Sequence, residues 1–352
     1  MNLPNIPSHK FRVKKNKYTC RRTNVFFTLN FIITKDMQKR TLGKSGIAVA
    51  PLTFGGNVFG WTLDEASSFQ LLDAFVGAGF NFIDTADVYS RWKAGNSGGE
   101  SETIIGNWMK KRGNRAQVVV ATKAGGDMGQ GKKDISKAHI LQAVENSLRR
   151  LQTDHIDLYQ THWDVVETPV EETLEAYAQL VKEGKVRAIG ASNFTAARLQ
   201  AALEASQRHG YPRYETYQPE YNLYAREGFE KELEPLCQKH GLGVINYYSL
   251  AAGFLTGKYR SESDFTKSAR GGGMAKYLNP RGLNILKALD EVAAEYKAPQ
   301  ASIALAWLIA RPSITAPIAS ATSLEQLNAL VKATELDLSA EAIATLNKAS
   351  AW

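Results

Sequence analysis

Cysteine is scarce in this sequence, with only Cys20 and Cys237 among 352 residues. Two distant cysteines argue against a disulfide framework or a cysteine-based zinc site, and they are typical of a reducing compartment. Long apolar runs are also lacking, because no stretch reaches the roughly 18 residues that suggest a membrane span. We therefore expect a cytoplasmic protein with no membrane partner, and we identify no metal ligands.

Positive charge is concentrated at the start of the chain. The net charge is +8, but residues 1–36 hold eight Lys and Arg side chains against one Asp. Residues 37–352 therefore carry a net charge of only +1. Because a nearly neutral body offers no electrostatic footprint for nucleic acid, we expect no nucleic-acid partner.

Residues 1–36 are basic and lack a clear hydrophobic period. They are an upstream extension with Met37 as the true initiator, a disordered arm, or a targeting segment. We favour the first two interpretations, because Thr28 and Asn30 interrupt the apolar stretch and no small-residue cleavage site follows. Residues 37–352 are expected to form a single domain.

From residue 37 onward, apolar runs rich in β-branched residues alternate with segments of helical spacing. Residues 136–151 and 170–182 have apolar side chains at steps of three or four, with Ser136 as an N-cap and Gly184 as a stop signal. The predicted strands are 49–54, 80–84, 118–122, 156–162, 188–193, 215–218, 243–249 and 314–320.

Eight strands joined by helices predict parallel pairing through right-handed crossovers. A doubly wound sheet and a closed (β/α)₈ TIM barrel both suit this pattern. The count of eight favours the barrel, as does the absence of a Gly-x-Gly-x-x-Gly fingerprint after the early strands. The gap between residues 249 and 314 predicts a long, lid-like loop after strand seven, with a merely flexible insertion as the alternative.

Polar side chains stand at the carboxyl end of almost every predicted strand. In a barrel these ends converge on one mouth, so we expect the side chains to meet there. In chain order they are Asp84, Tyr89, Lys123, His162, Ser192, Asn193, Gln218, Tyr247, Tyr248, Ser249, Ser320, Thr322 and Ser323.

Four of these side chains combine into one chemistry. A tyrosine hydroxyl has an ordinary pKa of about 10, so it is a weak acid near neutrality. A nearby ammonium of Lys123 is expected to lower the pKa of Tyr89, and Asp84 is expected to pair with Lys123 because a buried ammonium needs a partner. His162 is positioned to hydrogen-bond a carbonyl oxygen. The set predicts a general acid facing a carbonyl compound that accepts hydride.

Six blocks in this order resemble those of the aldo-keto reductase superfamily. The resemblance runs from about residue 41 to the C-terminus and is strongest with the bacterial branch similar to the β-subunits of voltage-gated potassium channels. The blocks are DTADVY (84–89), ATK (121–123), QTHW (160–163), GASNF (190–194), QPEYN (218–222) and LTGKY (255–259).

The resemblance implies a barrel that binds NADP(H) in extended form and reduces aldehydes or ketones. By matching motif, Asp84, Tyr89, Lys123 and His162 are the catalytic residues, with Tyr89 as the general acid. The matched cofactor-binding residues are Ser192, Asn193 and Gln218 at the nicotinamide carboxamide, Tyr247 at the nicotinamide ring, with Tyr248 as the alternative, and Ser249, Leu250, Gly253 and Lys258 over the pyrophosphate.

The end of strand eight departs from many relatives, which have a basic residue there for the 2′-phosphate. This chain instead has hydroxyl groups before a helix that begins near Leu324, a setting that suits a phosphate or a ribose hydroxyl. Ser320 and Gln326 complete the predicted cofactor site. We expect NADPH as the cofactor, with NADH as the alternative.

Two further functions remain open. A cofactor-binding redox sensor or channel-type partner subunit with slow turnover is compatible with the same resemblance. A different barrel enzyme, such as an isomerase, explains the four-residue set less well. Bulky side chains near the mouth (Trp61, Trp92, Trp163 and Phe194) predict an apolar or aromatic aldehyde as substrate. The oligomeric state cannot be read from the sequence.

Overall fold

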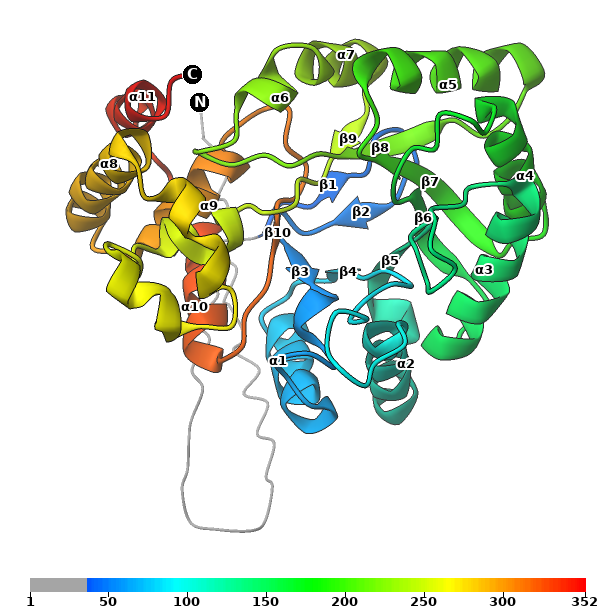
Figure 1. Cartoon of the computed structure of the whole chain (residues 1–352), viewed down its shortest axis with the longest axis horizontal. Coiled ribbons are helices and arrows are strands. Elements are labelled where there is room, and N and C mark those ends of the chain that lie inside the picture. Colours follow the sequence, from blue (N-terminus) through cyan, green and yellow to red (C-terminus); the bar gives the residue numbers. More distant parts are fainter. Residues whose placement is uncertain (1–36) are drawn as a thin grey trace, which may run out of the picture. The chain divides into compact units, whose positions relative to one another are not determined.

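The computed structural model describes residues 37–352, which fall within one compact unit. The three interpretations of residues 1–36 lie outside the described part. Eight parallel strands form one sheet in the order β10-β3-β4-β5-β6-β7-β8-β9, seen in Figure 1 as a curved wall lined by helices. These strands are β3 (Thr53–Gly55), β4 (Phe82–Asp84), β5 (Val119–Ala124), β6 (Ile156–Thr161), β7 (Val186–Ser192), β8 (Tyr214–Gln218), β9 (Gly243–Val244) and β10 (Ile318–Ala319).

Backbone contacts between β9 and the segment entering β10 join the two edges of the sheet. Val244 forms an isolated parallel bridge with Ile314, and its carbonyl oxygen accepts a hydrogen bond of 2.8 Å from the N–H of Thr315. The N–H of Ile318 donates to the carbonyl oxygen of Asn246 at 2.9 Å. The predicted (β/α)₈ barrel is therefore confirmed.

Helices follow most of the strands, as right-handed crossovers require. The two segments with the clearest helical period begin and end close to the predicted residues, and the Ser136 hydroxyl accepts a hydrogen bond from the N–H of His139 as an N-cap. The helices are α1 (Glu65–Gly77), α2 (Glu100–Arg112), α3 (Lys137–Leu151), α4 (Val170–Lys182), α5 (Ala196–His209), α6 (Glu227–Glu230), α7 (Leu233–His240), α8 (Pro280–Tyr296), α9 (Gln300–Ile309), α10 (Leu324–Ala333) and α11 (Ala340–Ala349).

A short hairpin that the sequence analysis missed closes the amino-terminal end of the barrel. Its strands are β1 (Arg40–Thr41) and β2 (Ala48–Val49), drawn inside the curved wall in Figure 1. Its apolar side chains join a buried cluster of the barrel interior, so this end is filled by a packed core. That cluster comprises Leu42, Ile47, Val49, Phe82, Val119, Ala121, Leu158, Ala188, Ile245, Ala316 and Ile318.

Four predicted strands are at least two residues shorter in the structure than in the prediction, and one of these is 80–84, which is observed as β4 (Phe82–Asp84). Residues 49–54 are divided between the hairpin and β3, because the chain leaves one sheet before it enters the other. The predicted strands 243–249 and 314–320 keep regular pairing only at 243–244 and 318–319. These two segments form the seam of the barrel, where the two edges of the sheet meet. At the seam, a single bridge and a few backbone hydrogen bonds replace a continuous ladder of hydrogen bonds.

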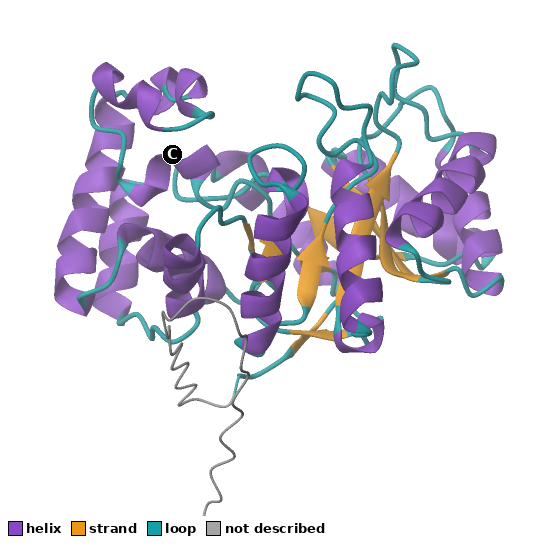
Figure 2. Cartoon of the chain, turned by 90° about the horizontal axis from the view of Figure 1, so that it is seen from below, coloured by secondary structure: helices purple, strands orange, loops and turns teal. Residues whose placement is uncertain are grey.

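The long connection after β9, the seventh predicted strand, contains regular secondary structure. Residues 250–279 form four short 3-10 helices, η3 (Ala251–Thr256), η4 (Glu262–Lys267), η5 (Gly271–Gly273) and η6 (Ala275–Tyr277). Figure 2 shows other long loops gathered beyond one end of the strands. No helix within residues 37–352 has the length and apolar character needed to cross a membrane.

A substitution in the interior of β7 is predicted to change the stability of the fold. A Cβ atom at Gly190 would lie 2.3 Å from Thr216 Oγ1 and 3.0 Å from Gln160 Cγ, both in neighbouring strands. Gly190→Ala is therefore expected to lower the free energy of unfolding by about 1–3 kcal/mol, as overpacked cores do. Chemical denaturation measures this loss. The control is Gly77→Ala at the end of α1, where a Cβ has no neighbour within 4 Å; an equal loss in both variants would contradict the account.

Candidate active site

The four candidate catalytic residues come from three adjacent strand ends. Asp84 is the last residue of β4, Lys123 is the penultimate residue of β5, and His162 directly follows β6. Parallel pairing aligns Asp84 with Ala121 and Lys123 with Gln160, so these ends lie at one mouth. Tyr89 reaches the same place from the loop between β4 and α2.

Lys123 is the centre of the contacts in this group. Its ammonium donates hydrogen bonds to Asp84 Oδ2 at 2.6 Å, to the Thr85 carbonyl oxygen at 2.8 Å and to the Tyr89 hydroxyl at 3.2 Å. The side chains of Lys123 and Asp84 are 0% and 2% exposed. Since an ammonium has three donors, all of its hydrogen-bonding capacity is used in this arrangement.

Burial and charge act in opposite directions on the pKa of Tyr89 and that of Lys123. Burial lowers the pKa of Lys123, but the charge of Asp84, with contributions from Tyr89, outweighs it and raises that pKa. Burial raises the pKa of Tyr89, and the charge of Lys123 offsets this only in part. The predicted net lowering of the Tyr89 pKa is therefore wrong in direction: the pKa is raised, and the Tyr89 hydroxyl is neutral at physiological pH.

His162 is held as a neutral ring. Burial, followed by the charges of Lys123 and Lys133, lowers its pKa well below the ordinary value. Its ring stacks on Trp163, with centroids 3.5 Å apart, and lies edge-on to the Tyr89 ring at 6.0 Å. A neutral imidazole carries one N–H donor, which is what hydrogen bonding to a carbonyl oxygen requires.

Two glutamine side chains form a polar floor beneath this group. The amides of Gln160 and Gln218 donate to Asp84 Oδ1 at 3.2 and 3.0 Å, and Gln218 also donates to Gln160 Oε1 at 3.2 Å. Gln160 was missed by the sequence analysis. Strand alternation could have found it, because Gln160 has the same parity in β6 as Leu158, which is part of the barrel interior.

The residues predicted at the nicotinamide form one hydrogen-bonded chain. The Ser192 hydroxyl donates to the Gln218 carbonyl oxygen at 2.8 Å, and the Asn193 amide donates to the His162 carbonyl oxygen at 2.9 Å. The Tyr247 hydroxyl donates to Asn193 Oδ1 at 2.9 Å. Tyr248 has a φ of 53° and is 45% exposed, so the geometry favours Tyr247 as the aromatic group of this chain.

The segment after Tyr248 combines strained backbone with a cation. Ala251, Ala252 and Gly253 have φ values of 48°, 55° and 104°, and the Lys258 ammonium would lie 3.7 Å from a Cβ at Gly253. Leu250 precedes this turn as the cap of η3. Ser249 is buried, and its hydroxyl exchanges hydrogen bonds with Asn246, so it supports the turn from below.

The two residues predicted near strand eight lie at the barrel seam and the start of α10. The Ser320 hydroxyl is 2.7 Å from the Gly55 carbonyl oxygen and 2.6 Å from Asn57 Oδ1. Gln326 Oε1 accepts a hydrogen bond of 2.9 Å from the N–H of Thr322. Both side chains therefore have internal partners in addition to any role toward a ligand.

Arg270 is a candidate residue that the sequence analysis missed. Its guanidinium lies 5.3 Å from the Trp61 ring centroid, and its Nη2 atom is buried without a hydrogen-bond partner among the described residues. Burial lowers its pKa, while the nearby hydroxyls of Tyr248 and Tyr89 act in the opposite direction. Only the folded loop brings this cation to the mouth, so its position in a Ser- and Gly-rich stretch gave no signal.

Aromatic side chains border the mouth beside Tyr89 and Arg270. The Trp92 ring lies 5.5 Å from Tyr89 and 5.8 Å from Trp61, and it is 48% exposed. Phe194 differs from the prediction, because it is buried and packs edge-on against Tyr214. The apolar wall therefore consists of tryptophans, while Phe194 belongs to the core.

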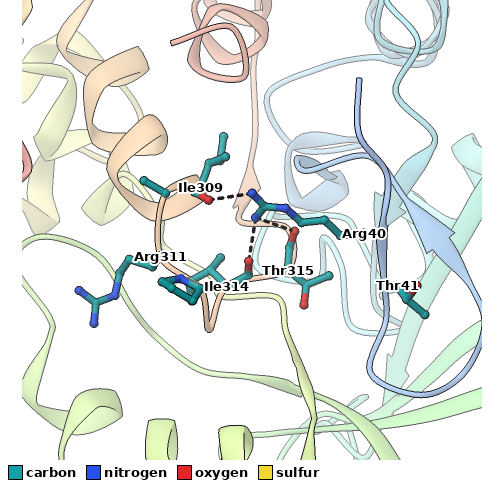
Figure 3. A pocket seen from close by; sticks show the side chains of 8 residues that line it. Arg40, Thr41, Ile309, Arg311, Ile314 and Thr315 are labelled. Atoms are coloured by element: carbon teal, nitrogen blue, oxygen red, sulfur yellow. Dashed lines mark hydrogen bonds between the residues drawn. The ribbon is translucent and has the colours of Figure 1, made fainter. Parts of the chain in front are cut away.

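A separate cavity of about 400 Å³ lies at the amino-terminal side of the barrel. In Figure 3, Arg40 points toward the chain between α9 and β10. Its guanidinium donates to the carbonyl oxygens of Ile309 and Ile314 at 2.9 and 2.8 Å. This arginine ties the hairpin to the barrel, and the cavity contains none of the candidate catalytic residues.

A buried acidic pair lies behind Lys123. Glu102 is fully buried and accepts hydrogen bonds of 2.6 Å from both Thr122 Oγ1 and Arg150 Nε. Asp87 is 2% exposed, and its Oδ1 atom has no partner among residues 37–352. Burial, together with repulsion from Glu102, raises the pKa of Asp87 to about 8, although Arg150 and Lys123 oppose this. The Asp87 carboxyl group is therefore mostly protonated at neutral pH.

Comparisons with known proteins point in the same direction as this geometry. A model of the aldo/keto reductase family matches residues 51–351. An uncharacterized oxidoreductase of Bacillus subtilis, YrpG, is 36% identical over 88% of this chain and 95% of its own length. The aldo-keto reductase YhdN of the same organism is 35% identical over 84% and 87%. A probable voltage-gated potassium channel β-subunit of rice is 33% identical over 85% and 92%.

Asp87 predicts a pH-dependent stability. Because its pKa is about 8 when folded and about 3.9 when unfolded, the folded state binds the extra proton between these values, and stability falls as pH rises through this range. Asp87→Asn cannot titrate. Its melting temperature is expected to fall less between pH 5 and pH 8 than that of the parent protein, as measured by thermal unfolding at both pH values.

The control is Asp337→Asn, which removes an exposed carboxylate and should follow the parent curve. A fall in Asp87→Asn as steep as in the parent protein would show that Asp87 ionises normally.

Proposed function

Because this chain belongs to the aldo-keto reductase family, and is thus an NAD(P)H-dependent oxidoreductase, we propose that it reduces aldehydes or ketones to alcohols with Tyr89 as the general acid. The observation that carries this proposal is the buried Lys123 ammonium, which contacts Asp84 at 2.6 Å and the Tyr89 hydroxyl at 3.2 Å. That arrangement supports a phenol that gives up a proton and is then left with a stabilised negative charge.

The residues of the mouth fit a nicotinamide dinucleotide. Tyr247 offers an aromatic face, and Asn193 offers amide groups for a carboxamide, while Lys258 and Arg270 supply cations for phosphates. The buried, unpartnered Nη2 atom of Arg270 favours an anionic ligand at this position, since a buried charged donor is costly to leave unpaired. When bound, the cofactor supplies a hydride ion.

The side chains then account for the proton. A carbonyl oxygen placed between His162 and Tyr89 accepts a hydrogen bond from the neutral imidazole. As the carbonyl carbon gains the hydride, the oxygen takes the proton from the Tyr89 hydroxyl, which gives an alcohol and a phenolate. Lys123 stabilises the phenolate until water returns the proton. Since burial keeps Tyr89 protonated, the acid is present throughout the neutral range.

The preference for NADPH over NADH is part of the same proposal. The start of α10 offers the hydroxyls of Ser320, Thr322 and Ser323 and the amide of Gln326, with no Lys or Arg between residues 317 and 326. Ser323 already caps the helix by accepting a hydrogen bond from the N–H of Gln326. Hydroxyls at a helix N-terminus suit a 2′-phosphate as well as a ribose hydroxyl, so it is the family resemblance that places NADPH first and NADH second.

A second candidate is a cofactor-binding subunit with slow turnover. The resemblance to the rice protein, whose name gives it as a probable channel β-subunit, favours it. The complete Asp84, Tyr89, Lys123 and His162 set weighs toward the reductase. The two functions differ in whether cofactor oxidation is coupled to a carbonyl compound at enzymatic rates.

Removal of the Tyr89 hydroxyl tests the proposal. Tyr89→Phe is expected to lower kcat/KM for an aromatic aldehyde at least about a hundredfold, the usual contribution of a general acid. Its affinity for NADPH should stay within about twofold of the parent protein, because binding does not need the proton. Aldehyde-dependent oxidation of NADPH and a fluorescence titration measure the two quantities.

Tyr211→Phe, far along the chain in the connection after α5, is the matched control for the loss of a tyrosine hydroxyl. Unchanged turnover in Tyr89→Phe would exclude Tyr89 as the acid. A parent protein whose oxidation of NADPH does not depend on the aldehyde would favour the slow-turnover subunit.

A further inference from the structure

A lysine at the edge of the mouth is stacked onto the catalytic histidine through one tryptophan. The Trp163 ring lies 3.5 Å from the His162 ring, with an angle of 22° between their planes. The Lys133 ammonium lies 5.2 Å from the Trp163 ring centroid. The Lys133 ammonium is therefore connected through a single intervening ring to His162, the residue proposed to face the carbonyl oxygen.

Trp163 also belongs to the wall beside Tyr89. A Cβ atom built at Gly126 would lie 2.8 Å from Trp163 Cζ3 and 3.5 Å from Val88 Cβ. Val88 directly precedes Tyr89, so the wall is continuous from Tyr89 to Lys133 by way of Gly126 and Trp163. A flat substrate lying along this wall with its carbonyl group at Tyr89 would extend toward Lys133.

The charge on Lys133 is not neutralised within the described part of the chain. No carboxylate of residues 37–352 lies within ion-pair distance of Lys133, whereas Arg91 is 3.9 Å from Asp127. Lys132 differs from Lys133, because its charge acts on a neighbouring carboxylate. Burial opposes the shift, but hydrogen bonds from Ser136 and the charges of His139 and Lys132 lower the pKa of Asp134. Lys133 is exposed, so its ammonium is free to meet a ligand.

We propose that Lys133 binds a carboxylate on the carbonyl substrate, so that the preferred substrates are aldehydes or ketones with a carboxylate at the end remote from the carbonyl group. A single ammonium matches a single negative charge, and the tryptophan wall suits a planar or apolar spacer between the two groups. This inference rests on the proposed reductase function, and it specifies the substrate class of that site.

The test compares two aldehydes that differ mainly in charge, 4-carboxybenzaldehyde and its methyl ester. Lys133→Met is expected to lower kcat/KM for the carboxylate about twofold to fivefold, mostly through KM, as a solvent-exposed ion pair allows. The ester should be affected less than the carboxylate. High salt should weaken the carboxylate preference of the parent enzyme, because the pair is exposed.

Lys132→Met is the matched control, since it removes an adjacent lysine that does not lie over Trp163. It should leave the ratio of the two substrates unchanged. An equal loss for acid and ester in Lys133→Met would overturn the proposal, because Lys133 would then act only by holding Trp163 in place. Equal effects of the two lysine variants would also overturn it.

A binding measurement separates this inference from the reductase function. Calorimetric titration of 4-carboxybenzaldehyde into the protein with NADP⁺ detects binding without reduction. Weaker binding in Lys133→Met together with no turnover of either aldehyde in the parent protein would refute the reductase but keep the carboxylate site. Unchanged binding together with normal reduction of the ester would refute the carboxylate site and keep the reductase.

Discussion

The buried ion pair between Lys123 and Asp84 constrains the carboxyl-terminal end of the barrel. An ammonium with no solvent contact loses several kcal/mol of hydration, which is recovered only if every donor has a well-placed acceptor. Lys123 has three acceptors, one of which is the Tyr89 hydroxyl. The Asp84 carboxylate in turn requires donors, which explains the two glutamines of the polar floor. The position of Tyr89 is thus a consequence of satisfying a buried charge.

The two ends of the barrel have different tasks. The amino-terminal end is closed by the β1–β2 hairpin and filled by aliphatic side chains and one phenylalanine, so it contributes hydrophobic stabilisation without strict polar geometry. The carboxyl-terminal end holds buried polar groups that stabilise little on their own. Arg40 fastens the hairpin through backbone carbonyls, which keeps the closed end rigid beneath the charged one. We infer that the apolar end supplies the stability that offsets the unfavourable burial of polar groups at the preorganised mouth.

Much of this arrangement could be predicted from the sequence, because parallel strands bring their carboxyl ends together and period-two alternation fixes which side chains point inward. Asp84 and Lys123 were found in this way. Arg270 and Lys133 were not, since both lie on loops whose path depends on tertiary packing. The direction of the Tyr89 pKa was also missed, because burial cannot be read from spacing. The predicted strand lengths were least accurate at the seam, where residues 243–249 and 314–320 close the barrel through one isolated bridge and a few backbone hydrogen bonds.

The most direct test follows the hydride itself. The protein is supplied with NADPH carrying two deuterium atoms at C4 of the nicotinamide ring, together with an aromatic aldehyde in ordinary water, and the alcohol is analysed by mass spectrometry. The account predicts one deuterium on the carbinol carbon and a proton from solvent on the oxygen. Oxidation of the cofactor without labelled alcohol would contradict the claim that this buried ion pair serves carbonyl reduction.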